Sequence, residues 1–241
     1  MSYWSRIKSI CVIAFCALAF VSKAQESSLP EGFTSGNTVW IARAGISLNN
    51  VSGSGIEDIK AAWAATKGAG DFKNTLGGAV SFGLYSPLAP SSFYFGVSLS
   101  AGMRGYRTSV KWKEGVSSLN AQTTKLTAFN AQIAPTCLGY IAKLSHNTAL
   151  DFHVGMFVSY DFAGSFEIED EYSGHSQKSS SININDDEDY EYYDIGFMGG
   201  IGLWINHWVI DLNYQRGIAT MEKSGYNLYS NVFLLSLGYA F

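Results

Sequence analysis

The sequence ends in NVFLLSLGYAF (residues 231–241), and this stretch indicates the fold class. Every second residue in it is large and apolar, namely Phe233, Leu235, Leu237, Tyr239 and Phe241, and most residues between them are small. A period of two indicates a β-strand with one apolar face. Because chain ends usually fray into water, an apolar end predicts a strand whose last side chain lies against a non-aqueous neighbour.

The same alternation recurs in longer segments upstream. The odd positions from Phe93 through Met103 are all apolar, and so are the even positions from Leu150 through Phe162. A strand of a soluble sandwich averages about 5–6 residues, whereas a membrane-spanning strand takes about 9–11. The lengths therefore favour strands that cross a bilayer.

Eight segments of this kind are predicted as strands. They are 38–49, 76–87, 92–108, 124–142, 149–166, 192–206, 208–219 and 229–241. Long connections between them alternate strictly with short ones, which is typical of an outer-membrane barrel with short periplasmic turns and long outer loops. We therefore predict an all-β fold: an eight-stranded antiparallel transmembrane up-and-down β-barrel over residues 38–241.

The first 24 residues have the layout of a secretory signal peptide. Arg6 and Lys8 precede an apolar run, and the small residues Ser22 and Ala24 stand three residues and one residue before a cut after Ala24. The apolar run is about half the 20 or so residues that a spanning helix needs, which favours cleavage over a membrane anchor. We expect cleavage near Ala24, then a short periplasmic segment at 25–37, and a location in the outer membrane of a Gram-negative bacterium.

Composition and charge limit the partners of the mature chain. Charged residues make up 15% of the sequence, against roughly 25% in an average soluble domain, which suits a surface in lipid. Arg6, Lys8 and Lys23 leave with the signal peptide, so 13 of the 16 Lys and Arg remain against 20 Asp and Glu. This acidic balance argues against a nucleic-acid partner. Cys137 is the single cysteine left, so no intramolecular disulfide can form.

Five segments also carry a family resemblance. They are ARAGISLNNVSG (42–53), FNAQIAPTCLGYIAKL (129–144), LDFHVGMFVSYDFAG (150–164), YDIGFMGGIGLWI (193–205) and NYQRGIATM (213–221). In order and spacing they resemble the porin-family, PorT-type outer-membrane β-barrel proteins, over essentially the whole mature chain. Gln132 stands where the resemblance implies a Glu. The resemblance implies a barrel and no shared enzymatic activity.

The last strand resembles the C-terminal signal that the outer-membrane barrel assembly machinery reads, because it alternates and ends in Phe. The resemblance implies that this machinery is a partner. Outer-membrane lipid is the second expected partner, because aromatic side chains suit the boundary between lipid and water.

If the apolar residues face lipid, the residues between them face the lumen. The predicted lumen network consists of Arg43, Arg104, Gln132, Asp151, His153 and Asp211, with both arginines paired to Asp151 and Asp211. Further lumen-facing polar residues are Asn130, Asp161, Asp194, Asn213 and Gln215. Eight strands enclose a space that side chains can fill, and charges there must pair or be hydrated. We expect a filled polar lumen; the alternative is a narrow conduit or a proton-sensitive site.

Two expectations concern local irregularities. Pro135 cannot donate to a strand ladder, so we expect a bulge or kink there, or else a break between two strands. GIEDIKAAWAATKG (55–68) places Ile56, Ile59 and Trp63 on one side, which predicts a short helix over the barrel mouth.

The connection at 167–191 is rich in acids and is interpreted as a solvated acidic hairpin. It is a possible contact for an extracellular or envelope protein partner. Asp186, Asp187, Glu188 and Asp189 are weak calcium candidates, since Ca²⁺ takes several carboxylate oxygens. Their spacing does not match an EF-hand loop, so no metal and no cofactor are predicted.

The sequence therefore predicts a non-enzymatic outer-membrane barrel that is structural or displays loops for partner binding or adhesion. The alternatives are a narrow channel for very small solutes and a lipid-modifying acyl transferase or deacylase, for which His175 and Ser176 are the only local candidates. A soluble lipocalin-like barrel would instead be apolar inside and polar outside. No catalytic residue is predicted.

Overall fold

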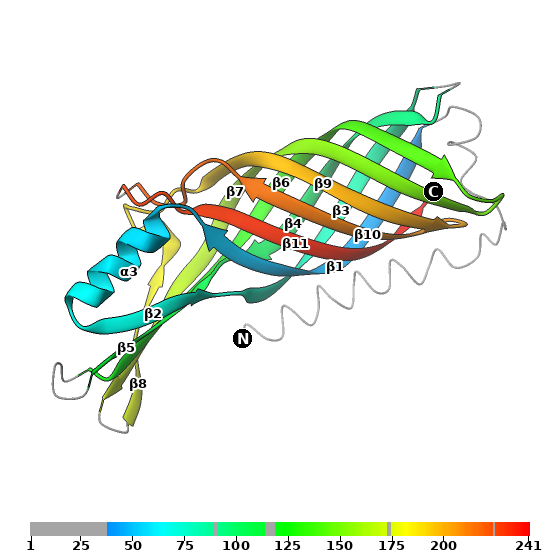
Figure 1. Ribbon diagram of the computed structural model, residues 1–241. Coiled ribbons are helices and arrows are strands. Elements are labelled where there is room, and N and C mark those ends of the chain that lie inside the picture. The colour runs from blue at the N-terminus through cyan, green and yellow to red at the C-terminus, as the bar shows by residue number, and fades with distance from the viewer. Residues whose placement is uncertain (1–37, 89–90, 114–118, 173–174, 224) are drawn as a thin grey trace, which may run out of the picture.

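The computed structural model describes residues 38–88, 91–113, 119–172, 175–223 and 225–241 (Figure 1). The predicted signal peptide and the 25–37 segment lie outside this part of the chain. Among the described residues, no helix combines the length and the apolar character needed to cross a membrane.

Eight antiparallel strands close into a ring, which confirms the predicted fold class. They follow one another around the ring as β1 (Val39–Ser52), β3 (Thr75–Pro87), β4 (Phe93–Arg104), β6 (Ala121–Lys143), β7 (Thr148–Tyr172), β9 (Tyr193–Ile205), β10 (Trp208–Gly217) and β11 (Tyr229–Ala240). β11 then pairs with β1, so the described ring has no free edge within the barrel. Each predicted strand corresponds to one of these eight, with ends shifted by a few residues.

The closure between β1 and β11 accounts for the apolar C-terminus. Ile41 pairs with Ala240, and the Phe241 N–H donates to the Trp40 carbonyl at 2.9 Å. Phe241 is 52% exposed on the outside of the ring, as the alternation predicts. Tyr239 differs, because it is covered by its aromatic neighbours: the ring of Trp208 lies 5.1 Å away from it, edge-on.

The two faces of the barrel wall have opposite chemistry. Outward side chains are apolar and exposed, for example Leu99 and Val154, whereas inward side chains such as Asp151 and Asp161 are polar and buried. A lipocalin-like barrel would show the reverse arrangement. The wall therefore suits an apolar surrounding phase and a polar interior.

Three further strands, outside the eight that were predicted for the barrel, extend the wall at one end. They are β2 (Gly68–Lys73), β5 (Arg107–Trp112) and β8 (His175–Asn183). With the adjoining ends of β6 and β7 they form a five-stranded sheet in the order β2, β5, β6, β7, β8, here called the extension sheet. It lies at the end of the barrel opposite the C-terminus (Figure 1).

The predicted strand over 92–108 is interrupted because β4 ends at Arg104 and β5 begins at Arg107. Gly105 makes this break possible, since a Cβ there would lie 2.1 Å from the Leu126 carbonyl oxygen. The chain can therefore leave the barrel wall and enter the extension sheet within two residues.

The predicted helix is confirmed as α3 (Gly55–Ala65), which lies against the extension sheet at the barrel end (Figure 1). Trp63 stacks on Phe72 of β2 with ring centroids 5.9 Å apart. Ile56 packs on the apolar cluster that closes this end of the lumen. A helix this short depends on such packing for stability.

The bulge expected near Pro135 is confirmed, and β6 runs through it without a break. Thr136 pairs with Gly155, and Leu138 pairs with Val154, so β6 carries one extra residue, Cys137. The bulge follows two residues after the proline whose missing N–H weakens the ladder.

Candidate functional site

One polar cluster in the lumen depends on two glycines of β9. Asp151 of β7 and Asp211 of β10 both pair with Gly202, so they flank a position without a side chain. His153 and Asn213 flank Gly200 in the same way, and a Cβ there would lie 2.5 Å from His153 Nε2. The glycines therefore let side chains from two non-adjacent strands meet.

The contacts within this cluster involve an imidazole between two carboxylates. His153 Nδ1 lies 3.6 Å from Asp151 Oδ2, and His153 Nε2 lies 3.8 Å from Asp211 Oδ2. Asn213 Nδ2 lies 3.0 Å from His153 Nε2. Tyr94 donates to Asp151 Oδ1 at 2.7 Å. The cluster combines two acids with one titratable base.

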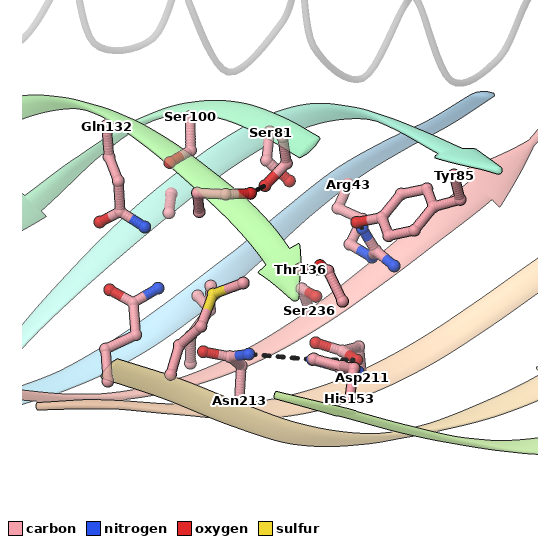
Figure 2. Close-up of a pocket in the computed structure, with 16 residues that line it drawn as sticks. Arg43, Ser81, Tyr85, Ser100, Gln132, Thr136, His153, Asp211, Asn213 and Ser236 are labelled. Atoms are coloured by element: carbon pink, nitrogen blue, oxygen red, sulfur yellow. Dashed lines mark hydrogen bonds and ion pairs between the residues drawn. The ribbon is translucent and has the colours of Figure 1, made fainter. Parts of the chain in front are cut away.

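Arg43 adds a fixed positive charge next to this cluster. Its guanidinium donates to the Tyr85 hydroxyl and lies 5.0 Å from the centre of the Tyr85 ring. Figure 2 shows Arg43, Tyr85, Asp211 and His153 around the same space. The predicted grouping of Arg43, Asp151, His153 and Asp211 is therefore seen, with Tyr85 and Tyr94 as hydrogen-bond partners.

That space is a cavity of about 60 Å³. Polar atoms that line it, including Asp211 Oδ2 and Asn213 Oδ1, have no hydrogen-bond partner among the described residues. A cavity needs roughly 10–15 Å³ per water molecule, so this one has room for several. Water can satisfy these groups, and the cluster needs no other ligand.

A second cavity of about 40 Å³ continues the first toward the extension sheet. Gln132 and Gln215 line both cavities, so they stand between them. The predicted network residue Gln132 thus links the Arg43 cluster to the Arg104 cluster.

Arg104 does not pair as predicted. Its partners are Asp161, with Nη2 2.7 Å from Oδ2, and Asp194, with Nη1 2.6 Å from Oδ2, rather than Asp151 and Asp211. All three side chains are at most 4% exposed. Ser230 also donates to Asp194, and Tyr190 donates to Asp161. The lumen therefore holds two charged clusters at different heights instead of one.

Two tyrosines above this cluster keep their protons. Burial, with the nearby Asp161 carboxylate, raises the pKa of Tyr190 well above its ordinary value. Burial, with Glu222, likewise raises the pKa of Tyr106, whose hydroxyl donates to Glu222 at 3.3 Å. Both hydroxyls therefore stay neutral donors at physiological pH.

Apolar clusters close the lumen at both ends. At the short-turn end, the buried side chains are Val39, Ile41, Tyr85, Tyr94, Ile141, Ala149, Trp204, Val209 and Ala240. At the other end they are Val51, Tyr106, Leu126, Ala128, Ile184, Tyr190 and Met221. The two polar clusters and the cavities lie between these plugs, so the interior is filled.

Among the described residues, one set of three side chains has metal-ligand atoms within 4.8 Å of one another: Asp151, His153 and Asp211. Arg43 already supplies a positive charge to this group. The weak calcium candidates Asp186, Asp187, Glu188 and Asp189 are not brought together in such a set. Asp187 instead accepts from the Asp189 N–H at 3.0 Å within the turn.

The acidic connection forms the predicted hairpin, with β7 running to Tyr172 and returning as β8. Glu167, Glu169 and Glu171 alternate with Ile168 and the buried Asp170, so the three glutamates share the outer face of the sheet. Asp170 faces inward and accepts from Gln122 at 2.9 Å. His175 and Ser176 lie in β8, where the described backbone places them opposite Tyr172 and Glu171.

Reasoning from the sequence missed the roles of Tyr85, Tyr94 and Tyr190 as lumen donors. For Tyr85 and Tyr94 a signal existed, since both occupy inward positions of alternating strands. Tyr190 lies in a connection without periodicity, and no feature of the sequence pointed to it.

Comparisons with known proteins agree with this architecture. The sequence profile described as outer membrane protein beta-barrel domain matches residues 24–221. A search of curated proteins found no match.

Similar solved structures include Ail, the attachment invasion locus protein of Yersinia pestis, solved with the heparin analogue sucrose octasulfate. It is 15% identical, with 85% of this chain and 99% of that chain covered and a TM-score of 0.35. Neisserial surface protein A is 10% identical, with 83% and 96% covered and a TM-score of 0.36. The N-terminal β-barrel domain of Pseudomonas aeruginosa OprF is 10% identical, with 85% and 98% covered and a TM-score of 0.30.

Proposed function

Since the chain belongs to the outer membrane protein beta-barrel domain family, we propose that it is a non-enzymatic barrel of the Gram-negative outer membrane that displays its extension sheet to a binding partner. The barrel would anchor the protein in the membrane, and the extension sheet would bind the partner. Within the family, the segments at 42–53, 129–144 and 150–164 support a place among the PorT-type proteins.

The filled lumen carries this proposal. Apolar plugs close both ends, and the charged clusters between them are paired or hydrogen-bonded. A pathway for even small solutes would have to displace both plugs. A closed interior instead makes the wall a stable support.

The β6–β7 hairpin connects that support to the displayed surface. Both strands run without a break from the short-turn end into the extension sheet, over 23 and 25 residues. Glu167, Glu169 and Glu171 line the outer face of β7 there, so a partner with a basic surface fits this region. The 167–191 connection is the proposed binding segment.

The proposed orientation follows the lengths of the connections. The extension sheet faces the exterior, and the short turns, with the C-terminus, face the periplasm. This orientation fits removal of a signal peptide near Ala24 and recognition of the last strand by the barrel assembly machinery. Phe233, Leu235, Leu237, Tyr239 and Phe241 are the residues that this machinery would read.

Two measurements on cells that express the full chain test the proposal. Outer-membrane fractions run on SDS gels with and without boiling should show a folded, boiling-sensitive band. Protease added to intact cells should cut within 167–191 or another long connection and leave the barrel intact. Soluble periplasmic protein, or protease protection of the extension sheet, would refute the proposal.

Planar-bilayer recordings separate a display barrel from a channel. The purified barrel should give no steady conductance. Discrete conductance steps that disappear when a side chain of the short-turn plug is enlarged, as in Tyr94→Trp, would favour the narrow channel.

A further inference from the structure

Three cations lie side by side on the extension sheet. Lys73 of β2 pairs with Arg107 of β5, and Arg107 pairs in turn with Lys125 of β6. Residues directly opposite each other in an antiparallel pair point to the same face, with Cβ atoms about 4.5–5.5 Å apart. The three side chains therefore form one row across three strands, here called the cation row.

The cation row lies on the outer face of the sheet. The neighbouring positions Phe72, Thr108 and Leu126 point the other way, and Phe72 and Leu126 belong to the apolar packing at the barrel mouth. Lys73, Arg107 and Lys125 are all exposed. Their charges are thus available to a ligand outside the barrel.

Acidic neighbours offset the row only at its Lys125 end, where Glu167 stands directly opposite on β7. In the part of the chain that the structure describes, no carboxylate pairs with Lys73 or Arg107, and Lys125 reaches only Glu167 at 4.0 Å. The nearest acid on β2, Asp71, is held by Lys60 at 3.0 Å. Like charges directly opposite each other destabilise a sheet, so a bound anion would relieve the repulsion.

The height of the cation row above the apolar wall indicates which anion it would bind. Along β6, Ile133 and Ala131 are exposed on the apolar outer wall, Phe129 follows, and Lys125 stands four residues beyond Phe129. At about 3.3 Å per residue along a strand tilted by about 40°, the row lies about 10 Å above the last aromatic side chain. The headgroup layer takes up about 5–8 Å on each side of the hydrocarbon core, so the row stands at the outer edge of that layer.

We propose that the cation row binds the phosphate groups of a lipopolysaccharide in the outer leaflet. An Arg guanidinium can donate to two phosphate oxygens at once, and the flanking lysines add point charges. The inference rests on the proposed function, because only the outward orientation of the sheet brings the row to lipopolysaccharide. The bound glycolipid would fix the sheet relative to the membrane surface.

The test uses the full mature barrel in detergent and purified lipopolysaccharide, in phosphorylated and enzymatically dephosphorylated forms. The variant K73Q/R107Q/K125Q removes the row. The variant K67Q/K143Q/K223Q removes the same charge elsewhere on the described surface and leaves the Lys60–Asp71 pair in place. Boiling-sensitive mobility on SDS gels shows that both variants fold.

A cation near an anionic membrane surface contributes about fivefold in affinity, so the row variant should bind phosphorylated lipopolysaccharide on the order of 100-fold more weakly. The control variant should lose less than about threefold, and dephosphorylated lipopolysaccharide should bind the parent as weakly as it binds the row variant.

Equal losses in both variants, or no difference between the two lipopolysaccharide forms, would overturn the inference. A row variant that binds phosphorylated lipopolysaccharide as well as the parent does would also overturn the inference, even if this variant binds a soluble acidic protein more weakly than the parent does. If one of these binding results is obtained while protease on intact cells still cuts the extension sheet, the inference fails and the proposed function stands. Protease protection of the extension sheet would instead refute both the proposed function and the inference that rests on it.

Discussion

Arg104→Ala should destabilise the barrel more than any other single change of a charged lumen residue. Arg104 is 4% exposed and makes four hydrogen bonds of 2.6–3.0 Å to Asp161 and Asp194. Its removal leaves two buried carboxylates facing each other without a counter-charge. Breaking a buried ion pair by removing one partner costs about 3–5 kcal/mol, which corresponds to a fall in unfolding temperature of about 10 °C for a chain of this size.

The midpoint of the boiling-sensitive gel shift against temperature, in a fixed detergent, measures this effect. Arg107→Ala is the matched control, because Arg107 is exposed and its loss should move the midpoint by about 1–2 °C at most. The triple variant R104M/D161N/D194N removes all three charges together and should recover most of the lost stability.

A midpoint for Arg104→Ala within about 2 °C of the parent would refute the reasoning, because it would mean that the two carboxylates are hydrated. Bilayer recordings of the same variant should remain silent, since the short-turn plug around Trp204 is untouched. A conductance would show that the Arg104 cluster, and not the plug, closes the lumen.

Three further outcomes are expected. Gly200→Ala should lower the free energy of unfolding by about 1–3 kcal/mol, because its Cβ would lie 2.5 Å from His153 Nε2, whereas Gly199→Ala, with no atom nearer than 3.6 Å, should change it by about 0.5 kcal/mol; equal urea midpoints would contradict this. Burial raises the pKa of Tyr190, so the stability that its protonated hydroxyl contributes is complete below the unfolded-state pKa of about 10 and is lost as pH rises beyond it; thermal scans should show a steeper alkaline loss for the parent than for Tyr190→Phe. Phe241→Ser should reduce the boiling-sensitive fraction in outer membranes severalfold while the purified protein still refolds in detergent, and normal assembly in cells would count against a role of this residue in the assembly signal.

The barrel could be predicted from the sequence because alternation reports which face each residue occupies. Leu150 through Phe162 predicted both β7 and its lipid-facing side. Alternation does not report height, however, and this explains the error about Arg104. The stagger between strands decides which polar residues lie at the same level in the lumen. The observed register places Arg104 beside Asp161 rather than Asp151.

Two strands of the extension sheet, β2 and β5, were missed for a different reason. GAGDFK and RTSVKW are short and polar, and neither shows an apolar period of its own. RTSVKW becomes a strand because it pairs with the free edge of the long β6 strand, and GAGDFK pairs in turn with RTSVKW. The glycines at Gly200 and Gly202 were likewise visible in the sequence, but only the pairing of β9 with both neighbours shows that they make room for the lumen cluster.

The unbroken β6–β7 hairpin has a mechanical consequence. At about 3.3 Å per residue, the 23 residues of β6 span about 75 Å from the short turn to the tip in one continuous strand. A pull on the tip along the strands loads many ladder hydrogen bonds in parallel, in shear, instead of opening them one after another. If the tip holds a partner as proposed, a pull on that partner would therefore break the contact at the tip before it extracted the barrel from the membrane.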